Sequence, residues 1–114
     1  MAEVPECRSL DEIRGQIDRI DRGIVSLIAE RGIHVRQAAR FKVTPADVRA
    51  PDRVAQVLAK ADALARELTA DPAVVAAVYR AMVGAFIQAE LAEHATLGRG
   101  ADAELPAAPP PADE

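Results

Sequence analysis

The sequence predicts an all-α fold with three helices per chain. Apolar residues recur at spacings of three and four through most of the chain, and no segment shows the apolar–polar alternation typical of a strand. Prolines and capping residues divide this pattern into segments at about 9–42, 51–68 and 71–96. Half of the 114 residues are apolar, which is enough for the modest core of one domain.

The first helix is predicted at about 9–42. The run SLDE at its start has the form of a capping box, in which Ser9 accepts from a first-turn amide and Glu12 returns the bond. No proline follows before Pro45, so the helix has about 34 residues and a length of roughly 50 Å. Its apolar stripe comprises Leu10, Ile13, Ile17, Ile20, Ile24 and Leu27.

This helix is too long for one chain to cover. A compact domain of this size has a radius of gyration of only about 13 Å, whereas the helix carries its apolar stripe over roughly 50 Å. The other two helices cannot bury all of it. The sequence therefore predicts that a second copy of the chain packs against the first helix, in a homodimer.

The second helix is predicted at about 51–68, because Pro51 suits a first helical turn and an apolar stripe follows it. That stripe comprises Val54, Val57, Leu58, Ala61, Leu64 and Leu68. The third helix, at about 71–96, has Asp71 as its cap and Pro72 as its first helical residue. The residues predicted to face inward on it are Val75, Val78, Tyr79, Met82 and Phe86.

These helices form one predicted domain at 9–97. It lies between a flexible N-terminus at 1–8 and a disordered tail at 98–114 that is rich in proline, alanine and acidic residues. The N-terminus lacks a basic region followed by an apolar one, and no uninterrupted apolar run is long enough to span a membrane. The single cysteine, Cys7, excludes an intrachain disulfide framework. We therefore expect a cytoplasmic protein that does not bind a membrane.

Cationic side chains are concentrated in the first half of the chain. Residues 8–53 hold ten Arg or Lys and seven Asp or Glu, whereas the rest of the chain holds four Arg or Lys and eleven Asp or Glu. The net charge of the whole chain is −4. The interleaved acidic residues and the scarcity of aromatic ones argue against a nucleic-acid surface, so a small anion is the better ligand. A lone cysteine cannot build a thiolate site, and His34 and His94 lack ligand spacing. We therefore expect no metal or cofactor and interpret both histidines as surface residues.

Three charged residues fall on apolar stripes. Arg31 and Lys42 are 11 residues apart, so on a continuous helix they share a face at a separation of roughly 16 Å, with Val35 between them. Glu90 follows Tyr79 by 11 residues on the inward face of the third helix. These charges either reach solvent at the edge of the bundle or surround a ligand. A simple pair of Lys42 with Glu90 would account for two of them but not for Arg31.

Arg14 adds a geometric constraint. It precedes Arg31 by 17 residues, which places it some 25 Å away along the helix and rotates it by about 100°. One pocket in one chain cannot easily use both residues. In an antiparallel pairing of two first helices, Arg14 of the partner subunit would come alongside Arg31 and Lys42. The alternative is that Arg14 is an ordinary solvated residue of the first turn.

The run IRGQIDRIDRGIVSLIAERGIHVRQAARFK resembles the first helix of the all-helical chorismate mutases, and within them the isochorismate pyruvate lyase branch of salicylate and siderophore biosynthesis. Arg14, the stretch IDRID, Arg31 and Lys42 stand in matching places. The run APDRV, with Arg53, is similar to the start of that family's second helix. The resemblance covers about residues 7–96. It implies an intertwined homodimer of three-helix chains with two active sites, each of which takes Arg14 from the opposite subunit.

The resemblance also implies a pericyclic reaction of a dicarboxylate, chorismate or isochorismate, that needs no cofactor. Such a reaction requires only a folded substrate conformer and stabilisation of the charge that grows on the ether oxygen. Arg14 of the partner subunit, Arg31 and Arg53 would bind carboxylates through their guanidinium groups. Val35 would line the substrate site. Lys42 would approach the ether oxygen from the loop.

Two positions bear on which reaction is catalysed. Glu90 stands where the family usually has a glutamine that donates to the ether oxygen, and a glutamate can donate only when protonated. We therefore expect activity to be favoured by acid. Val54 stands where housekeeping mutases place a carboxylate directly after the loop arginine, and members of the lyase branch tend to lack that carboxylate as well.

Three functions stay open from the sequence. The first is a chorismate mutase that makes prephenate. The second is a lyase that eliminates pyruvate from isochorismate and leaves salicylate. The third is a helical dimer without catalytic activity that acts as a binding or regulatory module, in which Val54 and Glu90 would be signs of a decayed site.

Overall fold

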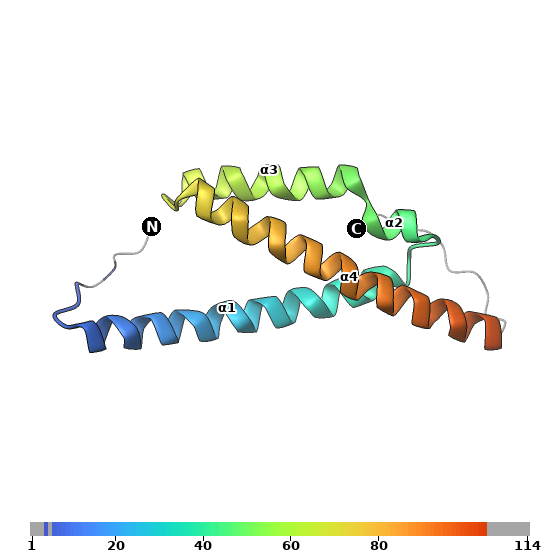
Figure 1. Cartoon of the computed structure of the whole chain (residues 1–114), viewed down its shortest axis with the longest axis horizontal. Helices are drawn as coiled ribbons and strands as arrows, with labels where there is room; N and C mark the ends of the chain where they lie inside the picture. The colour runs from blue at the N-terminus through green and yellow to red at the C-terminus, as the bar shows by residue number, and fades with distance from the viewer. Residues whose placement is uncertain (1–3, 5, 105–114) are drawn as a thin grey trace. The chain divides into compact units, whose positions relative to one another are not determined.

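The computed structural model of the chain describes residue 4 and residues 6–104, and over these residues its regular structure is entirely helical (Figure 1). The helices are α1 (Leu10–Ala39), α2 (Pro45–Arg49), α3 (Pro51–Glu67) and α4 (Pro72–Glu104). The prediction of an all-α chain with three long helices is confirmed. The short helix α2 is an additional element that the sequence analysis missed.

The chain divides into two compact units, Met1–His34 and Val35–Glu114. In the first unit α1 begins with the predicted side-chain cap, because Ser9 Oγ accepts from the Glu12 amide at 3.1 Å. The Glu12 carboxylate accepts in turn from the amide of Arg8 at 2.8 Å, one residue before the predicted partner. The predicted start of the first helix is therefore confirmed.

The apolar stripe of α1 is exposed in the single chain. Its six predicted members have exposed fractions between 42% and 66%, and they are Leu10, Ile13, Ile17, Ile20, Ile24 and Leu27. Single exposed apolar residues are common on protein surfaces, but a continuous stripe of this length usually marks an interaction surface. The homodimer that the sequence predicts would cover this stripe, and it stays a prediction.

The first helix ends at Ala39 and not, as predicted, at Lys42. The amides of residues 40–42 bond to carbonyls only three residues earlier, at 3.0 to 3.4 Å, so the chain tightens and then leaves the helix. The prediction that Arg31 and Lys42 share one helical face is therefore wrong, because it assumed that the helix continues to Lys42. Lys42 lies beyond the helix, where the 3.6-residue period no longer directs its side chain.

In the second unit α3 and α4 form an antiparallel pair of helices joined by residues 68–71 (Figure 1). The amide of Ala70 bonds to the carbonyl of Ala65 at 2.7 Å, which closes the end of α3 in a Schellman arrangement. Thr69 at this turn has a left-handed backbone with φ of 61°. Asp71 then caps α4 through its side chain, as predicted.

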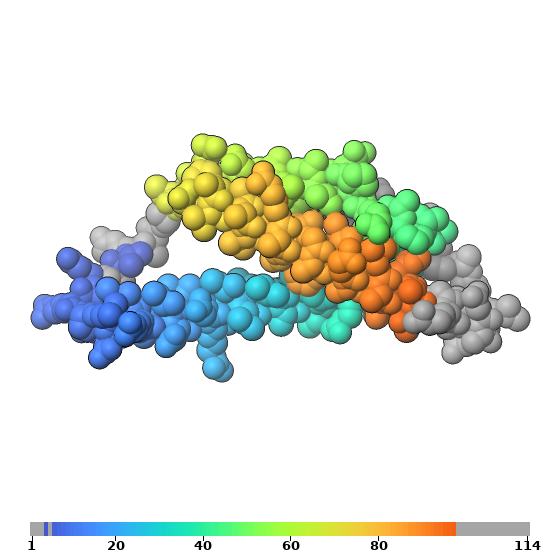
Figure 2. Space-filling model, viewed as in Figure 1, coloured from blue at the N-terminus to red at the C-terminus, as the bar shows by residue number. Residues whose placement is uncertain are grey.

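The core of the second unit lies along α4, which contacts α3 and, over its later part, α2 (Figure 2). The buried apolar residues are all small or of medium size, namely Ala39, Val48, Ala61, Ala65 and Val83. Two predicted stripe residues are about half exposed: Leu64 on the second helix, at 49%, and Val78, which was predicted to face inward on the third, at 55%. Among the described residues, a single chain thus buries small and medium-sized apolar side chains on all four helices and leaves several larger ones accessible.

Helix α4 continues to Glu104, past its predicted end at about residue 96. Residues 98–104, which were predicted to belong to the disordered tail, have a helical backbone here, and the disorder of the tail stays a prediction. Alanine and glutamate in this stretch favour a helix, and no proline interrupts it before Pro106. The rest of the predicted tail, 105–114, lies outside the described residues, as do residues 1–3 and 5 of the predicted flexible N-terminus.

The segment Pro72–Leu97 of α4 is long and apolar enough to span a membrane by length and composition, with a mean hydropathy of 1.4. The core helix of a soluble protein meets the same criterion, so this is weak support for a membrane helix. Glu90, within the segment, is 5% exposed and ion-paired to Lys42. This face of the segment therefore packs against protein.

Candidate active site

A buried ion pair joins the loop after α1 to α4. Lys42 Nζ lies 2.7 Å from Glu90 Oε2, and the two side chains are 8% and 6% exposed. The contact is close but is not aligned as a hydrogen bond, so Glu90 Oε2 has no hydrogen-bond partner among the described residues. Of the alternatives that the sequence left open, the simple pair is present. Whether these charges also surround a ligand stays a prediction.

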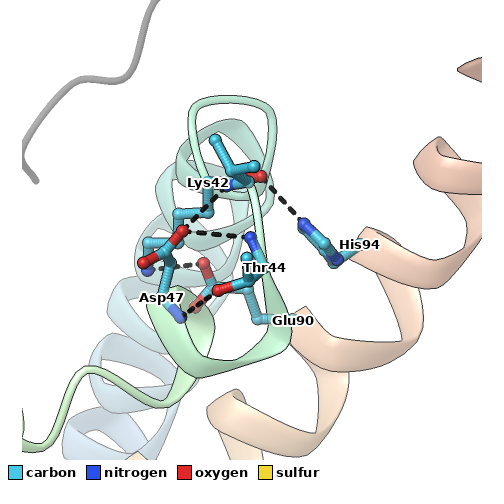
Figure 3. A network of polar contacts seen from close by, with 6 residues as sticks. Lys42, Thr44, Asp47, Glu90 and His94 are labelled. Atoms are coloured by element: carbon cyan, nitrogen blue, oxygen red, sulfur yellow. Dashed lines mark hydrogen bonds and ion pairs between the residues drawn. The ribbon is translucent and has the colours of Figure 1, made fainter.

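The loop that carries Lys42 is held by a dense set of local bonds (Figure 3). Thr44 caps α2, since its Oγ1 accepts from the Asp47 amide at 3.2 Å. Asp47 Oδ2 accepts from the amides of Thr44 and Val43 at 3.0 and 3.1 Å. These two amide bonds, with that of Thr44 contributing most, hold the pKa of the Asp47 carboxyl below its usual value. Lys42 thus directly precedes a turn that is closed by side-chain hydrogen bonds.

His94 on α4 contacts the same loop. Its Nε2 lies 2.8 Å from the carbonyl oxygen of Lys42, and the residue is half-buried (Figure 3). The prediction that His94 is a surface residue is therefore wrong. The two residues are 52 positions apart in the chain, and no spacing rule relates a histidine to a distant loop carbonyl. His34, the other histidine, is exposed as predicted.

Arg53 and Val35 belong to the same unit as the ion pair, and both are half-buried. Arg53 Nη1 donates to Gln56 Oε1 at 2.6 Å, one turn further along α3. This bond uses one of the five N–H donors of the guanidinium group, so others are available to an anion. Val54, directly after Arg53, is also half-buried and offers no polar group to a ligand.

Arg14 and Arg31 lie on α1 in the other unit. Arg14 is exposed and Arg31 is half-buried. The 17 residues between them correspond to about 25 Å of continuous helix, as predicted. Their convergence on the pair of Lys42 and Glu90 stays a prediction, because it depends on the second copy of the chain.

The chemistry that these side chains offer is the stabilisation of charge on oxygen. An ammonium group, a carboxyl group and a guanidinium group can donate hydrogen bonds to an oxygen-rich anion. Within the part of the chain that the structure describes, no group of three or more His, Cys, Asp or Glu side chains is arranged to hold a metal ion.

Two comparisons with known proteins bear on this site. Residues 13–91 match the family described as chorismate mutase type II. The chain is also 45% identical over 53 residues to the isochorismate pyruvate lyase of Pseudomonas aeruginosa. That match covers 46% of this chain and 52% of the relative, so it spans about half the length of that protein. The family match includes every predicted site residue, from Arg14 to Glu90.

Proposed function

Because the chain belongs to the chorismate mutase type II family, we propose that it is an enzyme that converts chorismate to prephenate. The observation that carries the proposal is the buried pair of Lys42 and Glu90 within the matched region. A chain that bound no ligand here would gain little from two buried charges, since an apolar pair of similar volume is often as stable or more stable. The pair is therefore better explained by a reaction that uses it.

Lys42 has the donors that this reaction needs. The ammonium group carries three N–H donors, so it can keep its contact with Glu90 and still donate to the ether oxygen of a substrate. Negative charge grows on that oxygen as the carbon–oxygen bond breaks, and a nearby cation in a site that excludes water lowers the barrier. Glu90 would add a second donor when protonated, with its other oxygen accepting from Lys42.

Guanidinium groups would bind the two carboxylates of the substrate. We propose Arg53 from the same unit, Arg31 from α1, and Arg14 of the partner subunit, with Val35 lining the apolar side of the site. Bidentate contacts of this kind fix the folded conformer in which the two reacting carbon atoms approach each other. The exposed apolar stripe of α1 supports the homodimer that would bring Arg14 of the partner subunit to the site.

A second candidate is the elimination of pyruvate from isochorismate to give salicylate. The 45% identity to a lyase over 53 residues favours it, as does Val54, which offers no carboxylate beside Arg53. Both reactions are pericyclic and would use the same cations, so the pair of Lys42 and Glu90 does not distinguish them.

The decisive experiment supplies purified protein with chorismate and isochorismate in separate reactions over a range of pH. Prephenate, salicylate and pyruvate are measured in each. Formation of prephenate supports the mutase, whereas equal amounts of salicylate and pyruvate from isochorismate support the lyase. If the protein turns over neither substrate but binds either of them in a calorimeter, it is a binding module and both catalytic proposals are wrong.

A further inference from the structure

Helix α4 contacts both the side chain and the main chain of Lys42. Glu90 contacts the side-chain nitrogen at 2.7 Å, and His94 contacts the main-chain oxygen at 2.8 Å (Figure 3). Glu90 and His94 are four residues apart, so they lie on one face of α4, one turn from each other. One helix face therefore controls both where the backbone of Lys42 lies and where its ammonium group points.

The backbone at Lys42 has few other hydrogen bonds that tie it to a helix. The residue follows the end of α1, and its own amide is at 3.4 Å from the carbonyl of Ala39, which is a long hydrogen bond. The amides that come next, those of Val43 and Thr44, bond to Asp47 in the same loop. These bonds shape the loop internally. The bond from His94 instead fixes the loop to α4, across 52 residues of sequence.

We propose that His94 is a positioning residue for Lys42, which holds the main chain of Lys42 on α4 so that the ammonium group stays at Glu90 when a substrate anion competes for it. The proposal rests on the proposed function only for its kinetic consequences. Without this bond, the loop could move away from α4 together with the ammonium group. A substrate would then bind to a donor that is no longer aimed at its ether oxygen.

The bond also determines the state of the imidazole ring. A carbonyl oxygen accepts and cannot donate, so the proton of neutral His94 must be on Nε2. Protonation of the ring leaves that N–H in place, so the bond survives a change of charge. The Asp47 carboxylate interacts electrostatically with the ring. The other charged groups on the elements that meet at the ring are the Lys42 ammonium on the loop and Glu90 and Glu93 on α4. The contact is therefore expected to operate in both charge states of His94.

The test compares three variants of the full chain. His94→Gln retains an N–H donor at nearly the same reach, whereas His94→Leu keeps volume and removes the donor. Glu93→Gln, a neutralising change at the adjacent position, is the control. Removal of one hydrogen bond predicts that His94→Leu lowers kcat about threefold to tenfold, with KM changed less than twofold because the arginines still bind the carboxylates. His94→Gln and Glu93→Gln should stay within twofold of the wild type.

Two readouts do not require activity. The 15N chemical shifts of the imidazole ring should report the Nε2–H tautomer, and amide exchange at residues 43–44 should be faster in His94→Leu than in His94→Gln. If the wild type lacks activity on both substrates, the chemical shifts and the amide exchange alone decide whether His94 positions Lys42. An Nδ1–H tautomer, unchanged exchange in His94→Leu, or equal loss of kcat in the Leu and Gln variants would overturn the proposal.

Discussion

Lys42 Nζ and Glu90 Oε2 lie 2.7 Å apart where each side chain is less than a tenth exposed. The lysine comes from a loop and the glutamate from the middle of the longest helix, so the pair ties an irregular segment to a regular one. A buried ion pair of this kind adds little net stability to a fold, but removal of one partner is strongly destabilising because it leaves the other charge buried and unpaired.

Lys42→Met is expected to destabilise the protein by about 3–5 kcal/mol, because it leaves the Glu90 carboxylate buried and unpaired. The double variant Lys42→Met with Glu90→Leu should recover most of this loss, since it removes both charges. Urea unfolding at a fixed protein concentration measures both. Lys60→Met, at an exposed lysine of α3, is the control and should change stability by less than about 0.5 kcal/mol. A double variant no more stable than Lys42→Met would contradict the prediction.

Glu90→Gln is expected to raise kcat/KM at neutral pH, because a glutamine amide donates to the ether oxygen, whereas an ionised glutamate cannot donate and repels the growing charge. The measurement is kcat/KM for the variant and the wild type under the same conditions. Glu93→Gln, at a neighbouring position of α4, is the control and should stay close to the wild-type value. A Glu90→Gln enzyme less active than the wild type would mean that Glu90 is only the structural partner of Lys42.

Shared sites in a homodimer predict complementation between two inactive variants. Arg14→Ala and Lys42→Gln should each lose most activity, the second with a donor still available to Glu90. In a mixed dimer, one site receives Lys42 from one chain and Arg14 from the other, so it is intact. A statistical mixture holds about half mixed dimers with one working site each and should regain about a quarter of wild-type activity. No recovery after subunit exchange would show that Arg14 does not act across subunits.

The sequence singled out Lys42 and Glu90 as charges on predicted apolar stripes, and the structure pairs the two side chains in a buried contact. It placed Lys42 on α1, however, because an apolar period does not reveal where a helix stops when no glycine marks the end. The helix α2 had a local signal, since Thr44 and Pro45 followed by Asp47 have the form of a cap, a first-turn proline and a capping box. His94 had none, because its contact exists only after folding.

Acid is expected to destabilise the loop that carries Lys42, because it protonates the Asp47 carboxylate that holds this loop. The pKa of this carboxyl is lowered in the folded chain, mainly by the amides of Thr44 and Val43, so its contribution to stability is present above the unfolded value of about 3.8. It is lost as pH falls through the lower, folded pKa. Asp47→Asn should therefore lower Tm at neutral pH and lose less stability than the wild type between neutral pH and about pH 3. A parallel fall of Tm in both proteins would contradict this.

Thr69→Gly is expected to stabilise the chain by about 1 kcal/mol. Thr69 ends α3 with φ of 61°, a left-handed conformation that is unfavourable for a β-branched residue and free of strain for glycine. The Schellman bond from Ala70 to Ala65 at 2.7 Å requires this conformation, so the strain is permanent in the folded chain. The gain is the relief of that strain less the larger backbone entropy of glycine in the unfolded chain. Ala70→Gly, at the next residue, has no positive φ to relieve and should destabilise, so urea unfolding of the two variants should give shifts of opposite sign.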